Sequence, residues 1–460
     1  MSRSSRWIIA FGVVCALVAA GPAASAGHLT DPRTRNLHPL GHIVEPASLI
    51  DPEIGNINIH SDIAFWGRLA FQGSWLGFNI RDISAPGAPR HVSFTSCAGN
   101  QGDIAVWENL LVRAWNTPAG APGPFGAGTT CDGVDVATFD DPVIAGAFEG
   151  VHVFDISDPT DPVLVAGVET ECGSHTLTAV PDPANGRLLI YSSPSSGLCP
   201  GIDVIEVPLD EPEEASLLGF EPAGSGINCH DTGVILGDAM LAACAGGTGF
   251  AVWSLGGALG GSLEDPLLLG TQSVPGVTIG HSAAFTWDGE ILVFGHEPGG
   301  GVQAECEETD DPVKRTVFFF ETDPAGGFSQ VGQWTLERTQ SNIENCTVHN
   351  FNIVPLRGRH VLVHGSYQAG TGVVDFTDPE NPVEVAWTDP PPIPVVPEFP
   401  VFCGGLGCEI GGAWSSYWYN GFIYETNITE GLNVFRFSGR QTAGALRLGH
   451  LNPQTQEFTL

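Results

Sequence analysis

Histidine recurs at one position of a repeated sequence segment, where it could bind a metal or act in catalysis. Five segments carry it: "NIHSD" (His60), "CGSHT" (His175), "NCHDT" (His230), "IGHSA" (His281) and "TVHNF" (His349). Two further histidines, His296 and His364, end apolar runs that follow two of these segments, and Asp231 and Glu297 each come directly after a histidine. Clustered neutral imidazoles suit zinc or copper, and nearby carboxylates can orient the second ring nitrogen.

Three interpretations of these histidines stay open at this stage. A histidine at a strand start can simply bond a backbone carbonyl or a carboxylate of a neighbouring segment. It can instead bind a metal, or a ligand without any metal. From His175 onward, successive histidines are about 50 to 70 residues apart, which matches no local metal-binding motif. The choice therefore depends on the fold that positions them.

The elements that would position the histidines form a sevenfold repeat of β-hairpins. Turn-flanked apolar strands recur as "WGRLAFQGS" (66–74), "WENLLVRAW" (107–115), "NGRLLIYSS" (185–193), "GDAMLAACA" (237–245), "DGEILVFGH" (288–296), "RGRHVLVHG" (357–365) and "YNGFIYETN" (419–427). Each is preceded by a short strand, such as "HTLTAVP", and followed by a third, such as "GVHVFDIS". An acidic proline turn often leads into a fourth strand, because proline fixes one backbone angle and Asp bonds the backbone of the turn.

Seven such units predict an all-β fold, a single seven-bladed β-propeller of four-stranded antiparallel blades over residues 27–460. The 60 glycines and 35 prolines agree with this, since neither suits a helix interior. The first strand of each blade lines the central channel, so we expect the five histidines to converge at one channel mouth, with His296 and His364 approaching the same face. Either "HPLGHIVEP" near the N-terminus or "LRLGHLNP" near the C-terminus can complete the last blade.

The N-terminus and the charge balance predict an exported protein. Arg3 and Arg6 precede the apolar run 7–20, and "ASA" ends at Ala26, so residues 1–26 are typical of a secretory signal peptide. Cleavage near Ala26 would leave a secreted or periplasmic chain, with no membrane span. The formal net charge of −35 disfavours nucleic acid and anionic membranes, and no basic patch is expected to offset it.

Ten cysteines remain after the signal segment, an even number that favours disulfides in an oxidising compartment. One group lies at or just before first strands: Cys97, Cys172, Cys229, Cys346 and Cys408. Another group follows second strands: Cys131, Cys199, Cys244 and Cys306. Disulfides between the two groups would crosslink the loops around the channel mouth. Cys403 could instead form a disulfide with Cys408 and close a small loop.

The turn motif also resembles a known family. The pattern "VFDISDPTDPVLV" at 153–165, weaker at 80–92 and 374–385, is similar to the LVIVD-repeat family of exported β-propellers. The resemblance covers nearly the whole mature chain. It implies a fold and an extracytoplasmic location, and no chemistry, because fold alone does not supply function.

Two functions follow from these observations. The first is a monomeric binding or interaction module that uses its loop face and central channel for a protein, peptide or glycan. The alternative is a metal-dependent enzyme, such as an oxidoreductase, that holds copper or zinc through the channel histidines. The two differ in one structural respect, because the enzyme needs the imidazoles to point at a common position.

Overall fold

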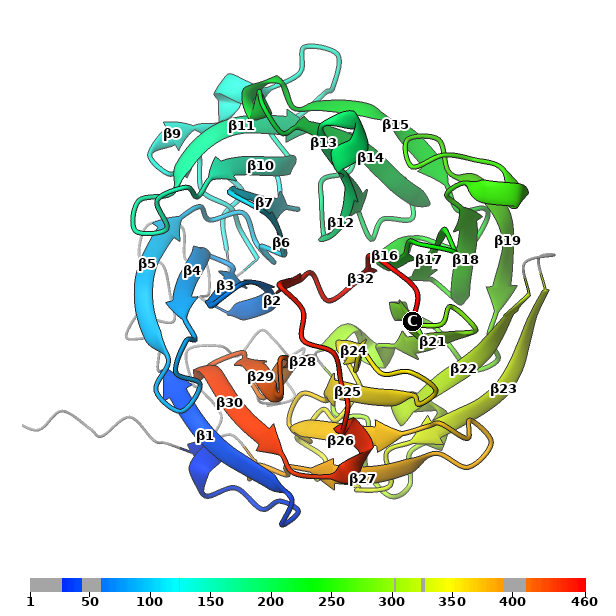
Figure 1. The fold of residues 1–460 in the computed structure, drawn as a ribbon. Coiled ribbons are helices and arrows are strands. Elements are labelled where there is room, and N and C mark those ends of the chain that lie inside the picture. The colour runs from blue at the N-terminus through cyan, green and yellow to red at the C-terminus, as the bar shows by residue number, and fades with distance from the viewer. Residues whose placement is uncertain (1–26, 44–58, 124, 302, 324–326, 393–410) are drawn as a thin grey trace, which may run out of the picture.

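Seven four-stranded antiparallel sheets form a ring in the computed structural model, which confirms the predicted seven-bladed β-propeller (Figure 1). The structure describes residues 27–43, 59–123, 125–301, 303–323, 327–392 and 411–460. Within these residues, the helical elements are short 3₁₀ turns, and no helix is long and apolar enough to cross a membrane. The expected signal peptide, residues 1–26, lies outside the described residues.

The strands of each blade follow one another from the channel outward, except in the last blade. The first four blades are β2 (His60–Trp66), β3 (Leu69–Ser74), β4 (Gly77–Asp82) and β5 (Arg90–Ser96); β6 (Ile104–Trp107), β7 (Leu110–Trp115), β10 (Gly150–Asp155) and β11 (Val163–Glu169); β12 (Thr176–Asp182), β13 (Arg187–Ser193), β14 (Gly201–Pro208) and β15 (Ser216–Pro222); and β16 (Cys229–Ile235), β17 (Leu241–Gly246), β18 (Gly249–Ser254) and β19 (Leu267–Ser273). The last three are β20 (Gly280–Phe285), β21 (Ile291–His296), β22 (Thr316–Asp323) and β23 (Gly327–Thr335); β24 (Phe351–Ile353), β25 (Val361–Gly365), β26 (Thr371–Asp375) and β27 (Val383–Trp387); and β28 (Ala413–Tyr419), β29 (Phe422–Asn427), β30 (Gly431–Phe437) and β1 (Leu37–Ile43).

The remaining elements are short. They are a hairpin of β8 (Thr130–Cys131) and β9 (Val134–Asp135), two C-terminal strands, β31 (His450–Leu451) and β32 (Thr455–Gln456), and the 3₁₀ turns η1 (Gly27–Leu29), η2 (Val136–Phe139), η3 (Pro183–Asn185), η4 (Pro212–Glu214), η5 (Gly257–Leu259), η6 (Pro298–Gly301), η7 (Pro312–Arg315) and η8 (Arg440–Thr442).

The acidic proline turns reverse the chain by the mechanism expected from the sequence. Between β10 and β11, the backbone N–H of Ser157 donates to Asp155 Oδ1 (2.8 Å) and that of Thr160 donates to Asp158 Oδ1 (2.9 Å). The pairing of β10 with β11 shifts register between Val153 and Phe154, so the outer strand is bulged. These local bonds set the place at which each third strand ends.

The N-terminal segment closes the ring. β1 pairs with β30, so "HPLGHI" supplies the outer strand of the last blade. The C-terminal segment, the other candidate, has a different place: β31 pairs with the end of β2, and β32 pairs with the end of β16 (Figure 1). Residues 450–456 therefore cross the channel. We call the face that this tail crosses the closed face and the opposite one the open face.

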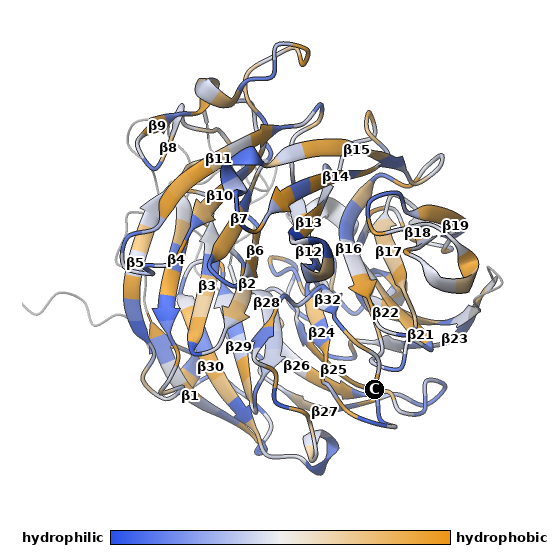
Figure 2. Ribbon diagram, turned by 45° about the horizontal axis from the view of Figure 1, so that its top comes forward, coloured by the Kyte–Doolittle hydropathy of each residue, from blue (hydrophilic) through white to orange (hydrophobic). Residues whose placement is uncertain are grey.

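The core consists of apolar clusters between adjacent blades, to which the strands contribute hydrophobic residues, coloured orange in Figure 2. Between the fourth and fifth blades, Phe250 packs against Phe294 and Phe320 with ring centroids 5.5 Å and 4.9 Å away. Each fully buried phenylalanine contributes about 1.5–3 kcal/mol. Inner strands are buried throughout, as in β16, whereas outer strands such as β19 are largely exposed.

Four disulfides join the two cysteine groups as the sequence predicts. The bonds are Cys97–Cys131, Cys172–Cys199, Cys229–Cys244 and Cys306–Cys346. Cys403 and Cys408 lie outside the described residues. Four disulfides fit a secreted or periplasmic protein, because such compartments are oxidising.

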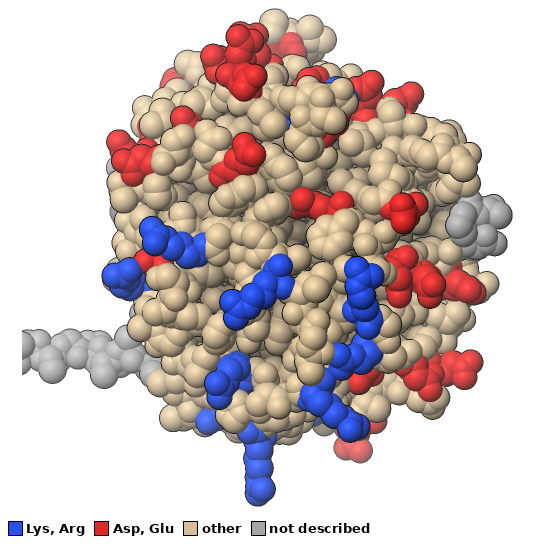
Figure 3. Space-filling model, viewed as in Figure 1, with Lys and Arg blue, Asp and Glu red and all other residues tan. Residues whose placement is uncertain are grey.

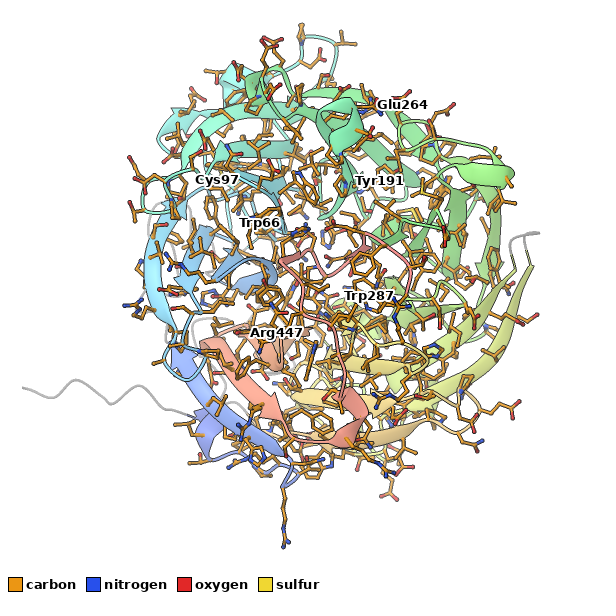
Figure 4. The ribbon with its side chains drawn as sticks, in the orientation of Figure 1. Trp66, Cys97, Tyr191, Glu264, Trp287 and Arg447 are labelled. Atoms are coloured by element: carbon orange, nitrogen blue, oxygen red, sulfur yellow. A yellow bond between two sulfur atoms is a disulfide. The ribbon has the colours of Figure 1, made fainter. Side chains whose placement is uncertain are left out.

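Lysine and arginine side chains gather on one part of the closed face, in the lower half of the view around β1 and β30 (Figure 3). The expectation that no basic patch offsets the acidity is therefore wrong for this face. Ring closure is the reason, since it brings the first and last blades together. Gly67 N–H donates to Gly449 O (2.8 Å), so the chain next to Arg68 meets the chain next to Arg447 although the two are far apart in sequence. Figure 4 shows Arg447 on the C-terminal segment, close to Trp66.

Candidate metal centre

Four histidines from consecutive blades meet at the open end of the channel. His175 and His349 lie just before β12 and β24, and His230 and His281 lie in β16 and β20. Their rings form a row: the centroids are 4.4 Å apart for His175 and His230, 3.9 Å for His230 and His281, and 4.1 Å for His281 and His349. They line a cavity of about 340 Å³, which we call the histidine cavity.

A hydrogen-bond partner holds the Nδ1 atom of each of the four rings. The partners are Asn116 for His175 (2.8 Å), Asp231 Oδ1 for His230 (2.9 Å), Ser282 Oγ for His281 (2.7 Å) and the backbone oxygen of Trp414 for His349 (2.6 Å). A partner on one ring nitrogen fixes the orientation of the ring and leaves the other nitrogen for a metal. The arrangement therefore leaves Nε2 as the nitrogen through which each ring, when unprotonated there, could bind a metal.

The bonding of His349 shows which nitrogen carries the proton. The backbone oxygen of Trp414 only accepts hydrogen bonds, so Nδ1 of the neutral His349 ring holds the hydrogen and Nε2 holds a lone pair. This Nε2 lies 3.5 Å from Glu297 Oε1, and His281 Nε2 lies 3.8 Å from Glu297 Oε2. Lone pairs that face a carboxylate need a proton or a cation between them.

His175 and His230 also need a proton or a cation between their ring nitrogens. Their Nε2 atoms are 2.8 Å apart, and Nδ1 of His230 donates to Asp231, so His230 Nε2 holds a lone pair. If the amide nitrogen of Asn116 faces His175 Nδ1, His175 Nε2–H donates to His230. If the amide oxygen faces it, both Nε2 atoms hold lone pairs, and a cation satisfies both. The two amide orientations occupy the same heavy-atom positions.

Burial keeps the four imidazoles neutral. It lowers the pKa of His230 and of His349 to about 3, and the pKa values of His175 and His281 also lie well below the usual 6.5, with neighbouring histidines adding to the effect. Neutral imidazole is the form that binds metals.

The carboxyl groups beside the rings respond to burial in the opposite direction. Burial raises the pKa of Asp231 to about 7 and that of Glu297 to about 8, although Glu297 accepts a hydrogen bond from the Tyr367 hydroxyl. A bound cation would favour their charged forms.

The spacing of the donor atoms fits one first-row transition-metal ion. His230, His281 and Glu297 each offer an atom, and these atoms lie within 4.8 Å of one another. Zinc binds imidazole nitrogen at about 2.0–2.1 Å, so ligands of one ion are about 3–4 Å apart. Small side-chain shifts bring the three atoms to this spacing, and His175 and His349 lie next to them in the row.

A glycine allows the acidic side of the cavity to form. Gly301 has φ of +73°, and a Cβ atom there would lie 2.5 Å from Glu297 Oε1 and 2.6 Å from the Tyr367 hydroxyl. A side chain at this position would therefore displace the Glu297 carboxyl group from the histidines.

Three other histidines in the predicted set do not line the cavity. His60, the first residue of β2, is buried, and burial lowers its pKa to about 3, with Arg81 nearby. His296 Nε2 bonds the backbone oxygen of Val313 (2.6 Å), and His364 Nδ1 bonds Ser366 Oγ (2.8 Å). The last two belong to second strands, whose side chains pack within and between sheets as well as toward the channel.

Sequence patterns alone did not reveal several groups at this site. Asn116 and Trp414 contact the histidines from other blades, Tyr367 contacts His349 from the β25–β26 connection of the same blade, and no motif joins the three. Below the rings lie Asp62 and Asp103, which are buried close to Asp231. The sequence does contain a pattern that points to Asp62 and Asp103. The segments "HSD" (60–62) and "QGD" (101–103) have an aspartate at the start of a first strand, as "HD" (230–231) does.

A second grouping, Cys97, Cys131 and His152, offers no thiolate because its cysteines form a disulfide.

Comparisons with known proteins support the fold. No protein-family model matches the chain, and no curated protein matches it. A solved structure of a protein from Lactobacillus plantarum is similar with a TM-score of 0.50 and 10% identity, over 87% of this chain and 97% of that one. A functionally unknown protein from Desulfotomaculum acetoxidans has a TM-score of 0.47 and 12% identity, over 80% of this chain and 98% of that one. At 10% identity, the likeness to the Lactobacillus plantarum protein concerns the fold alone.

Proposed function

We propose that this protein is an exported β-propeller that binds one copper or zinc ion in the histidine cavity and presents it to a ligand on the open face. The observation that carries the proposal is the common arrangement of His175, His230, His281 and His349. Each ring has its Nδ1 atom held by a partner and its Nε2 atom turned toward its neighbours or Glu297. Histidines with only a structural role do not need their Nε2 atoms gathered in one place.

The donor set limits the metal. Several neutral imidazoles with one carboxylate suit copper or zinc, whereas calcium and magnesium prefer oxygen ligands. An ion here would lie at the bottom of an open cavity, so an exogenous molecule could reach it. A metal ion at this position could polarise a bound molecule, and a copper ion could also transfer electrons. Both chemistries are expected of the oxidoreductase alternative.

The proposal includes the extracytoplasmic location inferred from the sequence. Cleavage of residues 1–26 and membership of the LVIVD-repeat family agree with the four disulfides and with the turn motif at 153–165. Binding of a protein, peptide or glycan at the open face without a metal is the second candidate. It is favoured by the amide orientation of Asn116 that lets His175 donate to His230 and needs no cation there.

Metal content of the purified, export-matured protein tests the proposal. We expect near-stoichiometric copper or zinc by elemental mass spectrometry, after exposure to both ions and dialysis. Combined replacement of His175, His230 and His349 by Gln should abolish retention. Replacing His60 by Gln is the matched control, because His60 starts the first strand of its blade and does not line the cavity.

The second candidate makes the opposite prediction. Parent protein that stays folded and retains neither metal after loading would contradict the metal centre and leave ligand capture on the open face as the function. Equal metal retention in the triple variant and the parent would also contradict the proposed ligands.

A further inference from the structure

We propose that the histidine cavity binds a small, uncharged aromatic molecule, with its ring against the aromatic side chains that line the cavity and a polar atom directed at the histidines. This inference adds a ligand class to the proposed function. Only one part of it, the contact between the ligand's polar atom and a bound metal, rests on that function.

Two pairs of aromatic side chains from neighbouring blades form an aromatic wall of the cavity. Trp75 follows β3, and its ring centroid lies 5.2 Å from that of Phe125 in the β7–β8 connection. Trp414 of β28 and Tyr367 have centroids 6.4 Å apart in an edge-to-face arrangement. Aromatic rings prefer partners at centroid distances of about 4.5–7 Å, so this wall favours a flat aromatic ligand.

Phe125 shows that the aromatic wall continues to the cavity entrance. It is 44% exposed, although it is a large apolar side chain that lines the cavity. Trp75 and Trp414, deeper in the wall, are buried. A ligand that covered Phe125 would remove this apolar surface from water, which favours binding.

The charges around the cavity disfavour an anionic ligand. Among the described residues that line it there is no Lys or Arg, and the one acidic side chain is Glu297. Besides the histidines, the other polar side chains that line it are neutral, and they include the amides of Asn100, Gln101 and Asn116 and the hydroxyl of Ser195. In the metal-free cavity, a carboxylate or phosphate ligand would therefore lose its hydration without gaining a cationic side chain.

The cavity size indicates a small molecule. Ligand cavities of drug-sized molecules span about 300–1,000 Å³, and 340 Å³ lies at the lower end. The end opposite the opening is closed, because Gln454 of the C-terminal tail bonds Asp62 (2.6 Å) below the histidines. A long polymer could not thread through the ring.

Calorimetric titration of the full mature chain tests this inference, with one sample freed of metal by dialysis against a chelator and a parallel sample loaded with copper. The probe is 4-methylphenol, with 4-methylbenzoate as the anionic comparison and 4-methylcyclohexanol as the non-aromatic one. We expect 4-methylphenol to bind the metal-free protein at least about tenfold more tightly than either. Phe125→Ala should raise its Kd about fivefold to tenfold, as the loss of an aromatic contact predicts. Phe94→Ala, a change of an equally exposed phenylalanine (42%) on the outer strand β5, should leave the Kd unchanged.

The outcomes separate this inference from the proposed function, because metal content is measured on the same samples. Retained metal with no preference for 4-methylphenol, or equal Kd values for the two phenylalanine variants, overturns the aromatic ligand and leaves the metal centre standing. Loss of metal with the preference intact overturns the metal centre and supports the ligand class.

Discussion

The Nε2 atoms of His175 and His230 lie 2.8 Å apart, although the two residues begin the inner strands of different blades. A third blade holds the first ring in place through Asn116, and Asp231 holds the second. The contact therefore exists only when three blades are assembled. The metal affinity of the proposed site depends on Asn116 and Asp231 as much as on the imidazoles themselves.

Removing the partner of His175 should weaken metal binding. Asn116→Leu leaves His175 Nδ1 without its hydrogen bond, and loss of such a partner typically costs 10- to 100-fold in metal affinity, so we expect a rise of about that size in the metal Kd. Asn116→Asp keeps an acceptor at Nδ1 and should retain affinity. Competition with a chromophoric chelator measures both, and Asn109→Leu, on an exposed turn, is the control. Unchanged affinity in Asn116→Leu would argue against ligation by His175.

The Cys229–Cys244 disulfide should stabilise both the fold and the site. Cys229 directly precedes His230, so replacing both cysteines by Ser loosens the strand start that carries this ligand. We expect a loss of about 2–4 kcal/mol in the free energy of unfolding, together with weaker metal binding. The pair Cys97 and Cys131 is the matched control, since its blade contributes no cavity histidine. Its replacement should lower stability similarly, measured by denaturant titration, and leave metal affinity near the parent value.

The C-terminal tail should stabilise the ring through Asn452. This buried side chain accepts from Val106 N–H (2.8 Å) and donates to Val106 O (2.8 Å) across the channel. Asn452→Leu leaves two buried backbone groups unpaired, and each such group costs about 1–3 kcal/mol. We expect a lower Tm by differential scanning calorimetry. Asn381→Ala, in an exposed turn, should stay within about 0.5 kcal/mol of the parent, and an equal Tm for both variants would contradict a stabilising tail.

Acid should destabilise the protein through His152, which lies outside the metal centre. Burial, with Arg113 nearby, lowers the pKa of His152 to about 3, whereas the unfolded chain titrates near 6.5. Between these values the unfolded state binds a proton that the folded state does not, so stability is full above pH 6.5 and falls as the pH drops toward 3. The slope is about 1.4 kcal/mol per pH unit for this group.

His152→Phe removes this term and retains a ring among Trp115, Phe139 and Phe148. We therefore expect a shallower fall in unfolding free energy between pH 6.5 and pH 4 than in the parent, measured by denaturant titration of metal-free samples. Parallel pH profiles for the two proteins would show that His152 titrates normally in the folded state.

Much of the architecture follows from the sequence because it depends on local chemistry. The Asp and Pro residues of 155–161 form the turn that their types predict, and the apolar runs become strands of the expected order. The two cysteine groups pair as expected, since a loop that follows a second strand lies at the same face of the ring as the start of a first strand. The sequence also identified His175, His230, His281 and His349 as strand-start residues that would meet at the channel mouth.

The tertiary structure decided everything that depends on register and ring closure. Which histidines line the cavity depends on side-chain direction, so His60, His296 and His364 fall outside a set that position alone had included. The closing strand is β1, which pairs with β30. The sequence could not decide this, because the N-terminal and C-terminal candidates both have the pattern of an outer strand. Asn116, Trp414 and the arginines of the closed face are brought together from distant segments. Contacts of this kind arise from the assembled ring, whereas turns and strands arise from neighbouring residues.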